Sequence, residues 1–328
     1  MRKKILVTGR LPEEVMGLLT EACQVEAQSE DRPMERKQLL DAIGDKEGLL
    51  SMITDSVDEE LLRHAPHLKV IANMGVGYNN IEVRAATARG IPVSNTPGVL
   101  TEATADLAFT LLLAAARRVV EGDKRVRAGE FQFWAPFLFL GREVSGKTLG
   151  IIGMGRIGMA VAQRACGFDM PVLYHNRRRL ESTEEEKLNV QYEPLDELLR
   201  KSDFISIHVP LTADTRHLIS RKEIALMKPT AYLINTSRGP VVDEQALLIA
   251  LQDGSIAGAA LDVYEHEPAL TPGLVLLNNV VLLPHVGSAT LETRTRMASM
   301  AAKNLLAGLS GQTPPNIVNP DALSPKPQ

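Results

Sequence analysis

Three side chains in the last third of the chain could act together on a small substrate: Arg238, Glu267 and His285. Each comes after a run of apolar residues that predicts a strand, so all three stand near presumed strand ends. A histidine can donate a proton near neutral pH, and a neighbouring carboxylate favours its protonated form. An arginine can bind a carboxylate and polarise a carbonyl oxygen. Taken singly, the same residues are equally typical of a surface ion pair, a loop charge and a turn histidine.

A glycine-rich turn earlier in the chain could bind the diphosphate of a dinucleotide. Gly153, Gly155 and Gly158 follow an apolar run and open a helical pattern, with Arg156 and Ile157 in its first turn. The first glycine suits a tight turn, the second a close approach to the diphosphate, and the third close packing of helix on strand. The helix N-terminus adds free N–H groups and a partial positive charge. This order of strand, glycines and helix predicts a dinucleotide site.

The end of the next predicted strand indicates which dinucleotide is bound. NAD sites usually place a carboxylate about 20 residues after the glycines, to accept from the ribose 2′-hydroxyl. The sequence has no carboxylate there; His175 is followed by Asn176, Arg177, Arg178 and Arg179. Guanidinium groups pair with a 2′-phosphate, so NADPH is expected to be preferred, with NADH possible. The alternative is a solvated basic turn with no role in cofactor choice.

Short β-branched runs alternate with amphipathic stretches along the whole chain, which predicts parallel sheets covered by helices. The predicted strands are Lys4–Thr8, Leu68–Ala72, Ile91–Ser94, Thr148–Gly153, Val172–His175, Phe204–His208, Tyr232–Asn235, Gly258–Leu261 and Val280–Leu283. The predicted helices are Pro12–Glu21, Asp58–Ala65, Ile81–Ala88, Ile157–Cys166, Asp196–Leu199 and Asp243–Gln252. Two doubly wound α/β units are the simplest architecture. A boundary is expected near Pro97-Gly98, where a turn precedes a helix capped by Thr101.

Length and composition exclude several classes of protein. A chain of 328 residues has room for about two domains of ordinary size. Its 36 basic and 40 acidic residues give a net charge of −4, so we expect no nucleic-acid partner. Two distant cysteines, Cys23 and Cys166, lie in helix-like segments with no zinc spacing, which favours a reducing cytoplasm and no metal. No signal peptide or membrane-spanning segment is predicted.

Taken together, the motifs resemble the D-2-hydroxyacid dehydrogenase family over nearly the whole chain. The matching segments are Gly153–Gly158, Arg238–Asp243, Leu261–Glu265, Glu267-Pro268 and Pro284–Thr290. The resemblance implies a flavodoxin-like substrate domain formed by residues 1–98 and 286–328. It implies an inserted Rossmann cofactor domain formed by residues 99–285, an active site in the cleft between them, and a homodimer. It also implies reduction of a 2-keto acid, with His285 as proton donor, Glu267 as its partner and Arg238 on the substrate carboxylate.

The same resemblance extends to further positions of this sequence. The residues that match substrate-binding positions are Val76, Gly77, Leu100, Trp134, Arg238 and His285. Besides the glycine turn and the basic turn, those that match cofactor-binding positions are Thr104, Val209, Pro210, Thr215, Thr236, Ser237, Arg238, Asp262, His285 and Gly287. Within the substrate-binding set, the resemblance implies that Val76 and Gly77 hold the substrate carboxylate through their backbone amides.

One aromatic segment belongs to none of these motifs. Residues 131–140 contain four of the seven phenylalanines and the only tryptophan, Trp134. Such density predicts a buried contact, either with a second subunit or within the chain. In glyoxylate/hydroxypyruvate reductases a tryptophan in a similar loop reaches the active site of the partner subunit, which favours the first of these interpretations.

Within the family, the basic turn and the Trp134 segment are most similar to NADPH-dependent glyoxylate/hydroxypyruvate reductases and their 2-ketogluconate-reducing relatives. One alternative is a 3-phosphoglycerate dehydrogenase-like NAD enzyme. Those enzymes carry an arginine for the substrate phosphate where this sequence has Asn73. Another alternative is a non-enzymatic corepressor that senses NAD(P), since such proteins of the family keep the three catalytic side chains.

Overall fold

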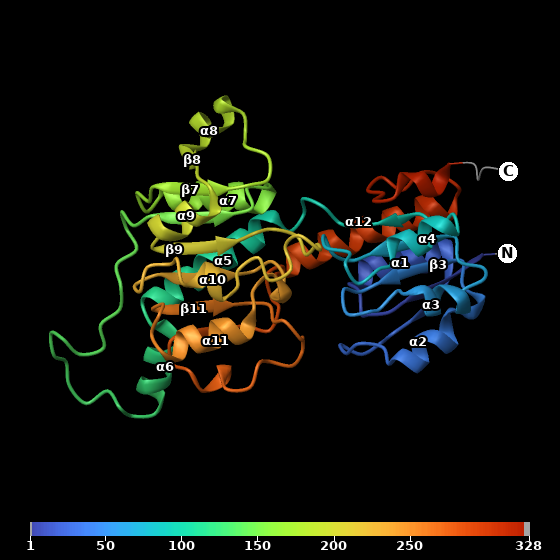
Figure 1. The fold of residues 1–328 in the computed structure, drawn as a ribbon. Coiled ribbons are helices and arrows are strands. Elements are labelled where there is room, and N and C mark those ends of the chain that lie inside the picture. Colours follow the sequence, from blue (N-terminus) through green and yellow to red (C-terminus); the bar gives the residue numbers. More distant parts are fainter. Residues whose placement is uncertain (1, 325–328) are drawn as a thin grey trace. The chain divides into compact units, whose positions relative to one another are not determined.

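The computed structural model describes residues 2–324, and the chain forms two compact units. Unit 1 consists of Met1–Leu100 together with Ala289–Gln328, and unit 2 consists of Thr101–Ser288. Both ends of the chain therefore belong to unit 1, and unit 2 is inserted between them (Figure 1). Each unit is built on its own parallel sheet, which confirms the predicted α/β class.

Unit 1 has a five-stranded sheet whose strands all pair in parallel. The strands are β1 (Lys3–Val7), β2 (Cys23–Ala27), β3 (Gly48–Ser51), β4 (Val70–Asn73) and β5 (Val93–Ser94). Their spatial order is β2-β1-β3-β4-β5, the flavodoxin-like order that the family resemblance implied. Strands β3 and β4 are buried along their whole length, as expected for a sheet with helices on both faces.

Helices cover both faces of this sheet. They are α1 (Glu13–Ala22), α2 (Arg36–Ala42), α3 (Glu59–His64), α4 (Val83–Ala88) and α12 (Leu291–Leu309), with short 3-10 turns η1 (Ile43–Asp45) and η4 (Pro320–Leu323). Helices α1 and α12 contribute to one apolar cluster, and α2, α3 and α4 to the other. The C-terminal α12 therefore completes the core of a unit whose strands come from the N-terminal part of the chain.

Unit 2 has a seven-stranded sheet, also parallel throughout. The strands are β6 (Leu149–Ile152), β7 (Val172–His175), β8 (Val190–Tyr192), β9 (Phe204–Ile207), β10 (Tyr232–Asn235), β11 (Gly258–Leu261) and β12 (Val280–Leu282). The order β12-β11-β10-β9-β6-β7-β8 is that of a Rossmann fold, with one additional strand at the β11 edge. The order reverses between β6 and β9, and ligands of such sheets bind at the carboxyl ends of strands near this point.

The helices of unit 2 also form two layers. They are α5 (Thr101–Ala116), α6 (Val119–Arg127), α7 (Arg156–Cys166), α8 (Ser182–Leu188), α9 (Leu195–Lys201), α10 (Arg221–Ile224) and α11 (Glu244–Gln252), with 3-10 turns η2 (Gly239–Val241) and η3 (Leu274–Leu276). Helices α5 and α7 pack on one face of the sheet, and α9, α10 and α11 on the other. A long irregular segment connects α6 to β6 and projects from the body of unit 2 (Figure 1).

Some sequence predictions of local structure were wrong. Cys23 begins strand β2 and does not lie in a helix, although Cys166 does end α7. Strands β2, β3 and β8 were not predicted at all. Thr101 is the first residue of α5 and not a cap before it. Among the described residues, we find no helix long and apolar enough to cross a membrane.

Candidate active site

The glycine turn lies between β6 and α7, next to the point where strand order reverses. Gly153 has φ of +99°, and a Cβ there would lie 2.7 Å from the backbone of His208. A Cβ at Gly158 would lie 2.2 Å from the carbonyl oxygen of Gly153, so helix and turn are in direct contact. At Gly155, by contrast, no heavy atom lies within 4 Å of the Cβ position. Side chains of any size are thus excluded at two glycines, while the third faces open space before the N-terminus of α7.

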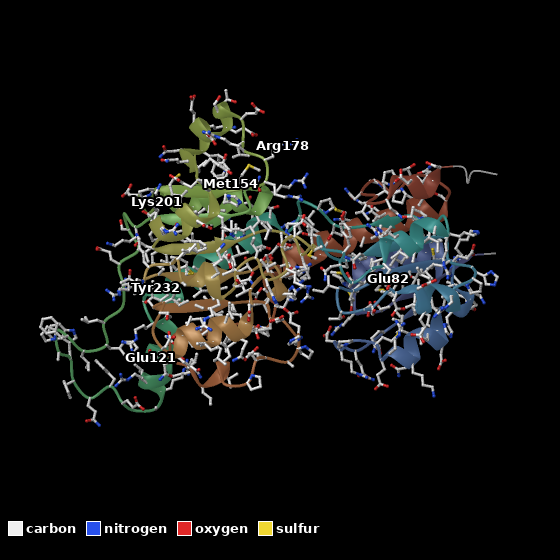
Figure 2. All side chains as sticks on the ribbon, viewed as in Figure 1. Glu82, Glu121, Met154, Arg178, Lys201 and Tyr232 are labelled. Carbon is white, nitrogen blue, oxygen red and sulfur yellow. The ribbon has the colours of Figure 1, made fainter. Side chains whose placement is uncertain are left out.

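The basic turn follows β7, the neighbour of β6 in the sheet. The backbone N–H of Gly153 donates to the carbonyl of His175, which joins the two loops at their bases. Arg177 and Arg178 are exposed and make no hydrogen bond or ion pair with the described residues, whereas Asn176 is half-buried. Figure 2 shows Arg178 on the segment that leads from β7 to α8. Two unpaired cations therefore lie on the loop next to the glycine turn.

Arg179, the third arginine of this turn, has a different role. Its guanidinium binds both carboxylate oxygens of Glu185 on α8, at 2.8 and 2.7 Å. Glu185 also accepts from the hydroxyl of the buried Tyr174, which in turn accepts from the backbone N–H of Leu180. The hydrogen bonds from Arg179 and Tyr174 lower the pKa of Glu185 to about 2. This cluster anchors the far end of the basic turn to β7, and no motif in the sequence indicated it.

The loop after β9 contains the predicted residues Val209, Pro210 and Thr215. The hydroxyl of Thr215 donates to the carbonyl of Pro210 and accepts from the backbone N–H of Thr212, so it closes this loop on itself. His208, at the start of the loop, forms a hydrogen bond with the hydroxyl of Ser206, and burial lowers the pKa of His208 to about 4. His208 is therefore neutral at physiological pH and adds no charge beside the glycine turn.

The loop after β10 is organised by the buried amide of Asn235. Its oxygen accepts from the backbone N–H and the hydroxyl of Ser237, and its nitrogen donates to the carbonyl of Arg238. Arg238 is half-buried, and burial lowers its pKa although the charge of Glu267 opposes this shift. Between them, the hydroxyl of Thr236 is buried and has no hydrogen-bond partner among the described residues.

The predicted pair of Glu267 and His285 is formed in the structure. Nδ1 of His285 lies 2.8 Å from Oε2 of Glu267, and Oε1 of Glu267 accepts from the backbone N–H of Tyr264. Burial raises the pKa of Glu267, but the hydrogen bond and charge of His285, the Tyr264 N–H and the charge of Arg238 together lower it below its ordinary value. Glu267 is therefore a carboxylate at neutral pH, and its negative charge lies against the imidazole of His285.

His285 stands on a turn that Asp262 holds in place. His285 has φ of +55°, a conformation that few non-glycine residues adopt. The buried carboxylate of Asp262 accepts from the backbone N–H groups of Val286 and Gly287, both at 2.7 Å. The backbone N–H of His285 donates to the carbonyl of Asp262 at 2.9 Å. The resemblance implied only a cofactor role for Asp262, so this structural role was missed. A buried Asp before a presumed turn was the available signal.

Two observations indicate that residues of unit 2 are suited to bind a nicotinamide dinucleotide. The open space at Gly155, before the helix N-terminus, suits a diphosphate. The unpartnered hydroxyl of Thr236 needs a hydrogen-bond partner, because a buried polar group without one is destabilising. Thr104 on α5 is buried beside Gly287, where its side chain lies 3.5 Å from the position of a glycine Cβ. No group of three potential metal ligands occurs among residues 2–324.

Comparison with known proteins identifies the family. Residues 109–287, more than half of the chain, match the family described as D-isomer specific 2-hydroxyacid dehydrogenase, NAD binding domain. The glyoxylate reductase of Thermococcus litoralis is 51% identical over 331 aligned residues and covers 100% of both chains. The chain belongs to the D-isomer specific 2-hydroxyacid dehydrogenase family.

Solved structures agree with this assignment. A protein from Thermus thermophilus is 46% identical, with a TM-score of 0.89, over 96% of this chain and 99% of that one. An NADPH-dependent glyoxylate/hydroxypyruvate reductase from Sinorhizobium meliloti, solved with NADP and malonate, is 34% identical, with a TM-score of 0.88 over 100% of each chain. This dehydrogenase is therefore an oxidoreductase that reduces a 2-keto acid to a 2-hydroxy acid with a nicotinamide cofactor. The corepressor alternative is not supported.

Three predicted substrate residues of the dehydrogenase belong to unit 1. Val76 and Gly77 follow β4, and Leu100 ends the first segment of the unit, where it packs against the apolar cluster of α1 and α12. Asn73 is completely buried, and its amide donates to the carbonyl of Gly77 at 2.9 Å. Asn73 therefore shapes the Val76-Gly77 loop from within, which is not the role of an arginine that binds a substrate phosphate.

The aromatic arm of the dehydrogenase, residues 131–140, has few contacts with the rest of unit 2. The side chains of Trp134 and Phe137 are 79% and 86% exposed, and Phe131 and Phe133 are also exposed. Among the aromatic side chains of the arm, only Phe139 has a described contact, because the guanidinium groups of Arg118 and Arg125 lie over its ring. The alternative of a hydrophobic contact within the chain is therefore wrong for four of these five aromatic residues.

Proposed function

We propose that this dehydrogenase reduces glyoxylate, hydroxypyruvate or 2-ketogluconate to the D-2-hydroxy acid with NADPH. The hydrogen bond of 2.8 Å between His285 and Glu267, beside the charge of Arg238, is the main observation in favour of this reaction. It supplies an oriented proton donor and a cation for a substrate carboxylate on loops that follow neighbouring strands β10, β11 and β12. The name of the Thermococcus litoralis relative supports glyoxylate as a substrate.

In the proposed reaction, the bound cofactor supplies the hydride that adds to C2 of the keto acid. His285 uses Nδ1 to contact Glu267, so Nε2 is the atom that donates the proton to the carbonyl oxygen. Arg238 binds the substrate carboxylate and stabilises the negative charge that develops on the oxygen. Glu267 keeps the imidazole oriented and favours its protonated form before the transfer.

The residues that would hold the cofactor follow the strands of unit 2. The glycine turn with Arg156 and Ile157 would bind the diphosphate, and the loop from Val209 to Thr215 would contact the adenosine half. Other residues proposed for the nicotinamide half are Thr104, Thr236, Ser237, Asp262 and Gly287. In unit 1, Val76, Gly77 and Leu100 would contact the keto acid.

Preference for NADPH is supported by the charge of the basic turn. No carboxylate ends β7, and the exposed Arg177 and Arg178 lack partners among the described residues, so both are available to a 2′-phosphate. A carboxylate at His175 would instead repel that group. The NADP complex of the Sinorhizobium meliloti enzyme is consistent with this proposal.

A homodimer is supported by the aromatic arm. Large apolar side chains that are exposed together commonly mark a protein interface, and the arm presents Phe131, Phe133, Trp134 and Phe137 to solvent. We propose that the arm packs on a second copy of the chain and that Trp134 contributes to the substrate site of the partner.

The reaction is tested by measuring oxidation of NADPH and of NADH with five acids. These are glyoxylate, hydroxypyruvate, 2-ketogluconate, pyruvate and 3-phosphohydroxypyruvate. We expect turnover with at least one of the first three and a higher kcat/KM with NADPH than with NADH. Strong preference for 3-phosphohydroxypyruvate with NADH would instead support the 3-phosphoglycerate dehydrogenase alternative. Absence of turnover with all five acids would refute the proposed reaction.

A further inference from the structure

A buried carboxylate outside the three proposed catalytic residues holds the loop that bears Glu267. Glu244 is the first residue of α11, and only 2% of it is exposed. Its Oε1 accepts from the backbone N–H of Glu265 at 2.9 Å. Its Oε2 accepts from the backbone N–H and the hydroxyl of Thr271, at 3.1 and 2.5 Å. One carboxylate therefore fixes the chain on both sides of Glu267.

The contact between α11 and this loop is reciprocal. The carboxylate of Glu265 accepts from the backbone N–H of Glu244 at 3.3 Å and also contacts Nε2 of His217 at 2.5 Å. A Cβ at Gly239 would lie 1.8 Å from the carbonyl group of Tyr264, so the Arg238 loop packs directly against the same segment. The N-terminus of α11 thus connects the loop of Arg238 with the loop of Glu267.

We propose that Glu244 is a positioning residue, which sets the place of Glu267 and through it the orientation and protonation of His285. This inference rests on the roles proposed above for Glu267 and His285. Glu244 does not belong to the groups expected to touch substrate or cofactor. Its side chain is engaged entirely by Glu265 and Thr271.

The chemistry of the contact requires a carboxylate at this position. Both oxygens accept hydrogen bonds, and the donors at Thr271 are an N–H and an O–H. A glutamine has one acceptor oxygen and one NH₂ group, so one end of the loop would face a donor in place of an acceptor. A buried donor without a partner is destabilising, so that end should move away from α11.

The test uses Glu244→Gln and the pair Thr271→Val and Thr271→Ser. We expect Glu244→Gln and Thr271→Val to lower kcat for glyoxylate reduction by about 10- to 100-fold, with little change in KM for NADPH. Their reduction activity should fail at a lower pH than that of the parent, because a displaced Glu267 no longer favours protonated His285. Thr271→Ser keeps the hydroxyl and should retain the parent pH profile. Thr271 variants keep the test valid if Glu244→Gln fails to fold.

Glu223→Gln is the matched control. Glu223 is a half-buried carboxylate that caps α10 in the same unit, through the backbone N–H and hydroxyl of Ser220. Its substitution should alter thermal stability without changing kcat or the pH profile. An equal change of the pH profile in Glu223→Gln would mean that any loss of a capping carboxylate disturbs the site, which would overturn the inference.

A double-mutant cycle separates this inference from the proposed function. If Glu244 acts through Glu267, then Glu244→Gln should have little further effect on kcat or the pH profile in a Glu267→Gln background. Full additivity, or unaltered kinetics of a folded Glu244→Gln while Glu267→Gln is impaired, would overturn the inference alone. A Glu267→Gln enzyme with the parent profile would refute the role proposed for Glu267 and this inference together.

Discussion

At the scale of single residues, proton transfer depends on how His285 is held and charged. Glu267 contacts the imidazole, and Asp262 fixes the backbone turn from which it projects. Burial raises the pKa of Asp262, although the N–H groups of Val286 and Gly287 and the charge of His285 oppose this shift. Two carboxylates therefore position His285: Glu267 contacts its side chain, and Asp262 holds the backbone turn on which it lies.

Glu267→Gln should change the pH dependence of reduction. The pKa of Glu267 is lowered mainly by its contact with His285, against the effect of burial, and by linkage the same contact favours protonated His285. Glu267→Gln removes the negative charge that favours protonated His285, and reduction requires His285 in its protonated form. The alkaline limb of kcat against pH should therefore move to lower pH. A limb at the same pH as in the parent would show that Glu267 does not act on His285.

His285→Ala should lower kcat more than Glu267→Gln does. Loss of a positioned proton donor typically lowers kcat by about 10²–10⁴-fold. The binding of NADPH should change little, which is measured by fluorescence titration of the free enzyme. Retention of most of kcat would mean that another group supplies the proton.

The sequence predicted the proposed catalytic residues better than it predicted the residues that hold them in place. Arg238, Glu267 and His285 were found because their residue types match the chemistry and their motifs match the family. The role of Asp262 in holding the turn was missed because a hydrogen bond to a backbone N–H leaves no signature in residue types. Arg179 was not separated from Arg177 and Arg178 for another reason: residue types alone do not show which of three consecutive arginines pairs with the side chain of Glu185.

At the scale of elements, the turn between β7 and α8 should determine cofactor choice. Replacing Arg177 and Arg178 with serine removes two cations that a 2′-phosphate of close to two negative charges would contact. We expect KM for NADPH to rise by about 10- to 100-fold while kcat/KM for NADH changes little. In the parent, raised salt should weaken the binding of NADPH more than the binding of NADH. In the variant, it should weaken the binding of both cofactors equally.

Arg200→Ser is the control for this prediction. Arg200 is a half-exposed arginine of α9 in the same unit, paired with Glu197, and its removal changes the net charge without touching the turn. A parent enzyme that already prefers NADH would contradict the cofactor proposal. The turn itself should stay intact in the serine variant, because Arg179 is anchored by Glu185, which the hydroxyl of Tyr174 also holds.

The three strands that the sequence failed to predict were missed for two different physical reasons. Strands β2 and β8 are edge strands with partly exposed residues, so neither shows the continuous apolar run of a central strand. Strand β3 is fully buried but begins with Gly48, where a Cβ would lie 3.0 Å from the side chain of Leu305, so this position is tightly packed. Its partner Leu305 lies on α12, far away in the sequence, and such contacts cannot be read from a local pattern.

At the scale of the whole molecule, the aromatic arm should control both assembly and substrate preference. Trp134→Ala should change KM for the keto acid while leaving KM for NADPH nearly unchanged. Serine at Phe131, Phe133 and Phe137 should shift the molar mass measured by light scattering from dimer toward monomer, because buried apolar area is lost from the interface. Leu18→Ser, an exposed apolar position on α1, is the control. A parent that is monomeric at all concentrations would exclude this role for the arm.

The insertion of unit 2 into unit 1 affects the order in which the chain can fold on the ribosome. Helix α12 supplies Met297, Ala301 and Leu305 to the core that also contains Ile5 and Val70, but it is synthesised after the whole of Thr101–Ser288. At about 5–20 residues per second, this delay is on the order of 10–40 s. During that time the N-terminal strands lack α12, which together with α1 covers one of their faces, while unit 2 is still being synthesised. The nascent N-terminal segment must therefore wait with apolar surface exposed, and we expect it to depend on chaperones during synthesis.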